Sequence, residues 1–237
     1  MHMNSLAQSP QIYTRIAGIC YLLIILLGIF GQIIVRNSLV VMNDATMTVN
    51  NIAESSQLWR LGIVGDITMH LLDIPLMVIL YLLLRPVHKT IALMALGFNV
   101  IQTAVLATNK LTLIIPLLLI SSQQTVVFTP EQINAQIMLL LDAHNYGFAL
   151  GLIFFGCACL GYGYLLFKSG YFPKPIGILI AVAGLCYLIN SFMLMLVPAL
   201  SSYTFLLLGV CLIAELSLCL RLLFFGVDLP VWTRVNK

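Results

Sequence analysis

Three ionisable residues lie in one apolar stretch, GDITMHLLDIPLMVILYLLLRP (residues 65–86): Asp66, His70 and Asp73. At about 100° per helical residue they lie within about 60° of arc, so they form one polar stripe on an otherwise apolar helix. Carboxylates and imidazoles act as general acids and bases, as proton relays and as metal ligands. An isolated charge in hydrocarbon costs about 2.5–3.5 kcal/mol on insertion scales. We therefore expect these groups to face the protein interior and to satisfy one another or a bound ion.

A second polar group occurs in the stretch LLDAHNYGF, which contains Asp142, His144, Asn145 and Tyr146. On an ideal helix His144 lies about 160° from Asp142, whereas Asn145 and Tyr146 flank Asp142. Asp142 and His144 therefore share a site only if the backbone between them is irregular.

Alternating helix directions place most of these groups at one depth, together with Lys110, and predict one outward-facing polar pocket. We predict catalytic roles for Asp66, His70, Asp73 and Asp142, ligand binding by Lys110, Asn145, Tyr146 and Glu215, and a divalent metal such as zinc on His70, His144 and Asp66. Each feature also has a structural interpretation: a hydrogen-bonded packing network for the stripe, a snorkelling side chain for Lys110, and helix-end anchors for Arg36 and Arg60.

The composition indicates an integral membrane protein. Of the 237 residues, 61% are hydrophobic and only 8% are charged, whereas soluble domains carry about 25% charged residues. The net charge of +3 comes from a few loop residues. It therefore bears on topology and gives no reason to expect a nucleic-acid partner.

The chain contains six apolar runs that are long enough to cross a bilayer, which takes about 20 residues. They lie at about 16–35, 61–84, 90–119, 136–167, 175–197 and 203–226. We predict an all-α integral membrane protein, a bundle of six transmembrane helices that forms a single domain over residues 1–237. Lys110 interrupts the third run, and the polar segment 37–59 has room for an interfacial helix or a lid. In the turn KSGYFPKP, we expect Tyr171 and Phe172 to lie at the headgroup boundary.

Basic residues are concentrated on one side of this arrangement, which predicts cytoplasmic N- and C-termini. The residues on that side are Arg15, Arg85, Lys89, Lys168, Lys174, Arg234 and Lys237.

The chain resembles the Domain of Unknown Function 4386 family of bacterial multi-pass membrane proteins. The stretches that carry the resemblance are GDITMHLLDIPLMVILYLLLRPV and LDAHNYGFALGLIFFGCACLGYGYLLFKSGYFPKPIGILIAVAGLCYLI, and its most specific part is SGYFPKPIG. The resemblance implies a helical protein of the bacterial cytoplasmic membrane. It implies no substrate and no catalytic residue.

Three classes of function remain open at this point. One is an enzyme acting on a lipid-like or small molecule, through a zinc site or through acid-initiated cyclisation with Asp73 or Glu215 as the acid. The histidine spacing does not match a strong metal motif such as HExxH. The second is a small ion- or proton-coupled transporter, and the third is a non-catalytic receptor or assembly subunit. The expected partners are the lipid bilayer and a lipid-like or small-molecule ligand. The sequence does not predict the oligomeric state.

Overall fold

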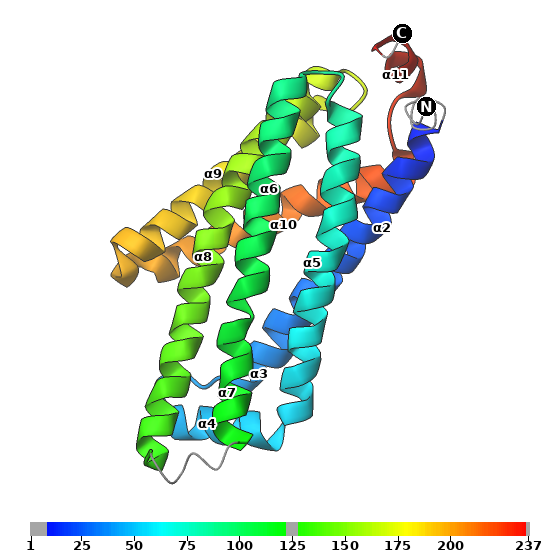
Figure 1. Ribbon diagram of the computed structural model, residues 1–237. Helices are drawn as coiled ribbons and strands as arrows, with labels where there is room; N and C mark the ends of the chain where they lie inside the picture. Colours follow the sequence, from blue (N-terminus) through cyan, green and yellow to red (C-terminus); the bar gives the residue numbers. More distant parts are fainter. Residues whose placement is uncertain (1–8, 122–127, 236–237) are drawn as a thin grey trace. The chain divides into compact units, whose positions relative to one another are not determined.

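A computed structural model describes residues 9–121 and 128–235 (Figure 1), and within these ranges every regular element is a helix. The elements are α2 (Pro10–Ile29), the π-helix η1 (Phe30–Arg36), α3 (Asn37–Leu39), α4 (Ala45–Glu54), α5 (Ser56–Leu84), α6 (Lys89–Asn109), α7 (Leu111–Ser121), α8 (Pro130–Ser169), α9 (Lys174–Leu196), the 3₁₀-helix η3 (Pro198–Leu200), α10 (Ser201–Leu220), the π-helix η4 (Arg221–Phe225) and α11 (Leu229–Val235). The predicted all-α class is confirmed.

Six helical segments in the described ranges are long and apolar enough to cross a membrane, as predicted. They are Pro10–Leu39, Ser56–Leu84, Lys89–Ser121, Pro130–Ser169, Lys174–Leu196 and Leu206–Phe225. Most extend beyond the predicted bounds, because helical hydrogen bonding continues into polar sequence. The fourth segment, for example, begins at Pro130, directly after Thr129, whose hydroxyl accepts a hydrogen bond from the Gln132 amide at 3.4 Å.

The exposed face of α5 is largely apolar, unlike the exposed face of a helix in a soluble protein. Large apolar side chains at Ile67, Leu71, Ile74 and Val78 are exposed, and Leu71 is 62% exposed. The buried positions of the same helix include Asp66, His70 and Asp73. An apolar outer face suits a helix surrounded by lipid, and the three polar groups lie on the inner face among buried apolar side chains such as Ile63 and Leu76.

The chain separates into two compact units, which we describe one at a time. Unit 1 comprises Met1–Leu23, Leu72–Ala104 and Ala149–Lys237, and unit 2 comprises Ile24–Leu71 and Val105–Phe148. Folding of residues 1–237 as a single domain stays a prediction.

Unit 2 has its own apolar core. Its buried members are Val35, Leu39, Ile52, Trp59, Ile63, Leu113, Leu117, Ile133, Ile137 and Leu141. The Trp59 indole donates a hydrogen bond to the Leu113 carbonyl at 2.9 Å, which ties α5 to α7. The helix expected in segment 37–59 is present as α4, which begins after the N-cap Asp44 and packs against α7 (Figure 1).

In unit 1, α8 and α9 approach closely where both helices carry glycine. A Cβ atom on Gly184 would lie 2.7 Å from the Gly156 carbonyl oxygen, and one on Gly163 would lie 2.6 Å from the Ala181 nitrogen. Small residues allow membrane helices to pack backbone to backbone. This pair therefore depends on the absence of side chains at these positions.

The turn between α8 and α9 is present, with Gly170 at φ +73°, a conformation that glycine adopts without strain. Tyr171 and Phe172 are only 1% and 3% exposed, so their side chains pack inside the protein. Their place at the headgroup boundary stays a prediction. The Tyr171 hydroxyl donates to the Leu83 carbonyl at 2.6 Å. Burial raises the pKa of Tyr171, so the phenol keeps the proton that it donates. The two aromatic rings thus hold the turn against the helices.

Candidate ligand-binding site

The polar core of unit 2 is centred on Asp66 of α5, which is 1% exposed. One of its oxygens, Oδ2, accepts from two cations: Arg36 Nη1 at 2.7 Å and Lys110 Nζ at 2.9 Å. Both distances fall in the range of strong charge-assisted hydrogen bonds. These are the two ion pairs in residues 9–121 and 128–235, so Asp66 takes part in every ion pair described.

Lys110 reaches Asp66 from a break between two helices. It lies between α6 and α7 in a turn, where its own amide bonds to the Ala107 carbonyl at 3.2 Å. The predicted interruption of the third run at Lys110 is thus confirmed. The side chain is only 3% exposed, so it does not snorkel to an outer surface.

Arg36 reaches the same carboxylate from the end of η1. A π-helix is rare and is often found at functional sites. The Gln32 side chain accepts from Arg36 Nε at 2.9 Å and holds the guanidinium in place. The close approach requires glycine at position 31, since a Cβ there would lie 2.5 Å from Asp66 Oδ1.

His144 lies in a neutral hydrogen-bonded set. Its ring Nδ1 is 3.1 Å from Asn109 Nδ2 and 3.1 Å from Thr112 Oγ1, and Asn109 Nδ2 also donates to the His144 carbonyl at 2.9 Å. His144 is 5% exposed. Asn109 and Thr112 lie on either side of Lys110 in the sequence. The helix break therefore positions both the Lys110 cation and the hydrogen-bond partners of the His144 ring.

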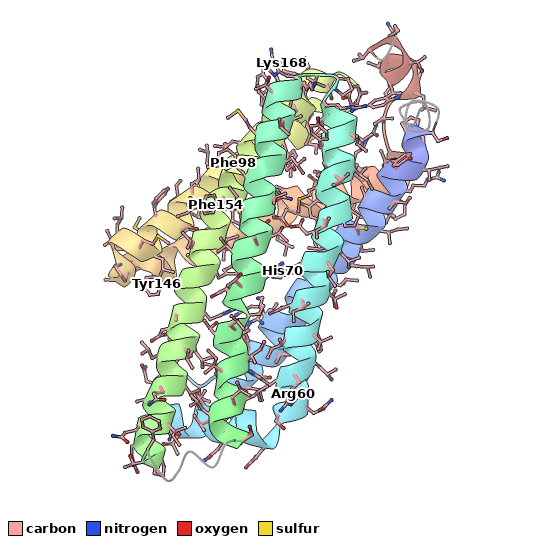
Figure 2. All side chains as sticks on the ribbon, viewed as in Figure 1. Arg60, His70, Phe98, Tyr146, Phe154 and Lys168 are labelled. Atoms are coloured by element: carbon pink, nitrogen blue, oxygen red, sulfur yellow. The ribbon has the colours of Figure 1, made fainter. Side chains whose placement is uncertain are left out.

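His70 follows Asp66 by four residues on α5 (Figure 2) and is 5% exposed. Its Nε2 is buried without a hydrogen-bond partner among the described residues. The rings of His70 and His144 both lie within electrostatic range of Lys110 and Asp66. The structure therefore brings the two histidines to the same charged centre, which consists of Arg36, Asp66 and Lys110.

Other predicted site residues lie elsewhere. Asp142, Asn145 and Tyr146 are exposed on α8, and Tyr146 (Figure 2) is 43% exposed. Because Asp142 and His144 lie on opposite sides of a regular helix, burial of His144 turns Asp142 outward.

Asp73 and Glu215 belong to unit 1. Asp73 accepts from the Thr103 hydroxyl, and Glu215 accepts from the Tyr187 hydroxyl. The two carboxylates are buried or half-buried and each is held by a neutral donor.

The predicted zinc set of His70, His144 and Asp66 is not assembled. Within the part of the chain that the structure describes, no three His, Cys, Asp or Glu side chains are placed to hold a metal ion. The physical reason lies at Asp66, where two cations occupy the carboxylate that would bind the metal.

Asn109 and Thr112 are not among the predicted site residues, and Arg36 was predicted to be a helix-end anchor. The available signals were the polar pattern Asn-Lys-x-Thr within the third apolar run and Gln32 four residues before Arg36. A side chain four residues away on a helix can support a long basic residue.

A sequence profile described as Domain of unknown function (DUF4386) matches residues 16–226. An uncharacterized protein of the archaeon Archaeoglobus fulgidus is 32% identical over 129 residues, which cover 54% of this chain and 64% of the relative. The chain thus spans less than two thirds of that relative, and the similarity extends beyond bacteria. No solved structure matches the chain.

Proposed function

Because the chain belongs to the family described as Domain of unknown function (DUF4386), a name that assigns no activity, we propose its function from the geometry of unit 2. It is a membrane protein that binds the anionic end of a lipid-like or small molecule on Arg36 and Lys110. Binding is the step that an enzyme, a transporter and a receptor for such a molecule have in common.

The observation that carries the proposal is the charge balance at Asp66. Two cations share one carboxylate oxygen, so one positive charge is left without a counter-charge in the described core of unit 2. An uncompensated buried charge is unfavourable by several kcal/mol. A carboxylate or phosphate of a ligand would supply the missing negative charge.

Two further features suit such a ligand. The Arg36 side chain is 14% exposed, against 3% for Lys110, so Arg36 is the cation that an incoming group meets. Its guanidinium can bind a carboxylate or phosphate through two nitrogens. The free Nε2 of His70 supplies one more polar atom for the ligand.

The test is a binding titration of the purified full chain in non-ionic detergent with dodecyl phosphate, dodecanoate and neutral dodecanol, followed by native mass spectrometry. We expect the anionic amphiphiles to bind at least about tenfold more tightly than dodecanol, a difference of about 1.4 kcal/mol. Inorganic phosphate tests whether the anion alone suffices. Arg36→Gln should remove the preference for the anionic compounds, and His70→Ala should weaken binding more than it lowers stability.

The matched control is Arg60→Gln, because Arg60 is an exposed arginine on α5 of the same unit (Figure 2). It should bind as the unaltered protein does. Equal affinities for dodecyl phosphate and dodecanol, or equal losses in Arg36→Gln and Arg60→Gln, would contradict the proposal.

The orientation is also proposed: both termini on the cytoplasmic side of a bacterial-type cytoplasmic membrane, on the basis of the loop charges. Reporter fusions after Lys168 and after Lys237 should read cytoplasmic, and one at Gln124 should read external. Gln124 and Lys237 lie outside the described residues. An external reading at the C-terminus would overturn this orientation.

A further inference from the structure

We propose that Asp73, Asn99, Thr103 and Tyr162 form a binding site for a monovalent alkali cation in unit 1. The site goes beyond the anion binding proposed for unit 2 and rests on different residues. Its four members come from α5, α6 and α8.

Asp73 is a buried carboxylate that is bonded only by neutral groups. It is 9% exposed, and it accepts from the Thr103 hydroxyl and, at 3.5 Å, from Asn99 Nδ2. In the described ranges it has no ion-pair partner, since both ion pairs there involve Asp66. A buried carboxylate without a counter-charge is strongly unfavourable, so a positive charge at Asp73 would be stabilising.

Two buried oxygens of this cluster lack hydrogen-bond partners in the described part of the chain. They are Asn99 Oδ1 and the Tyr162 hydroxyl, in residues that are 2% and 4% exposed. Tyr162 lies within electrostatic range of the Asp73 carboxylate. Buried polar atoms are nearly always paired, so an unpaired oxygen on Asn99, which bonds Asp73, and an unpaired hydroxyl within electrostatic range of Asp73 indicate an absent partner.

The Thr103 hydroxyl cannot satisfy both acceptors that it contacts. Thr103 Oγ1 contacts both Asp73 Oδ2 and Gln102 Oε1, the latter at 3.3 Å, but a hydroxyl has a single proton to donate. A metal cation satisfies several oxygens at once, and hard cations prefer oxygen ligands.

The charge of the cluster favours a monovalent ion. Asp73 is its one carboxylate, and the remaining oxygens belong to an amide and to hydroxyls, which are neutral. The Glu215 carboxylate lies within electrostatic range of Asp73, but it accepts a hydrogen bond from the Tyr187 hydroxyl. A single positive charge therefore neutralises the site.

The experiment compares thermal unfolding of the purified full chain in sodium, potassium and choline chloride at equal ionic strength, together with equilibrium binding of radioactive sodium. We expect sodium or potassium to raise the unfolding temperature above its value in choline and to bind saturably at one ion per chain. The preferred ion identifies the occupant. Asp73→Asn should abolish the binding, and Tyr162→Phe should weaken it about tenfold, or about 1.4 kcal/mol.

The control is Tyr164→Phe, because Tyr164 is exposed on the same helix and should not affect the ion. Equal unfolding temperatures in all three salts without saturable binding would overturn the proposal. So would an infrared carboxylic-acid band that disappears in Asp73→Asn, since it would identify a proton as the occupant. If Asp73→Asn does not fold, unchanged binding in Tyr162→Phe would equally overturn it.

Discussion

Asp66→Asn is expected to lower the free energy of unfolding by about 3–5 kcal/mol, because it leaves the Arg36 and Lys110 cations without their shared carboxylate. Most of the loss in stability comes from Lys110, because its ammonium group is only 3% exposed and cannot be solvated by water in place of the carboxylate. Denaturant titration of the detergent-solubilised protein measures the loss.

A double replacement separates charge from packing. In Asp66→Leu/Lys110→Met both buried charges are gone, and we expect at least half of the lost stability to return, as for other buried ion pairs replaced by apolar side chains. The exposed Asp142→Asn should change stability by less than about 0.5 kcal/mol. A similarly small loss in Asp66→Asn, or no recovery in the double variant, would refute the buried charge cluster.

Gly184→Ala is expected to lower the free energy of unfolding by about 2–3 kcal/mol, because the new methyl group meets backbone atoms that cannot move aside. It would lie 2.7 Å from the Gly156 oxygen and 3.0 Å from the Leu160 nitrogen. Relief of this clash requires α8 and α9 to separate. The same denaturant titration applies.

Gly97→Ala makes the same chemical change in the middle of α6, where a Cβ would meet nothing within 4 Å. There the alanine should raise stability by about 0.5–1 kcal/mol, since alanine is the better helix former. Equal effects at positions 184 and 97 would show that α8 and α9 do not pack as closely as described.

The spans and the inward face of α5 could be predicted because they follow from strong physical rules. Six apolar runs of sufficient length predict six helices, and Asp66 and His70, one helical turn apart, share a face on any regular helix. Lys110 was identified as an interruption of its run. The structure confirms each of these points.

The partners in the site could not be predicted because they depend on helix phase and packing. Both faces of LLDAHNYGF carry a polar residue, so the sequence did not decide whether Asp142 or His144 is buried. Arg36 was predicted to be a helix-end anchor, because no sequence pattern predicts the π-helix that ends at this residue. The burial of Tyr171 likewise depends on the Leu83 carbonyl, 88 positions away in the chain.

The π-helix η1 makes the charged centre tolerant of the loss of one residue. An α-helix closes its hydrogen bonds over four residues and a π-helix over five, so loss of one residue between Phe30 and Arg36 would let this stretch return to α-helix. The side chains on either side of the deletion would then keep nearly their present orientation, because the π-helix already accommodates one extra residue, whereas the same deletion within an α-helix rotates the following side chains by about 100°. A family member with one residue fewer in this segment would therefore still bring an arginine to Asp66, from an uninterrupted α-helix.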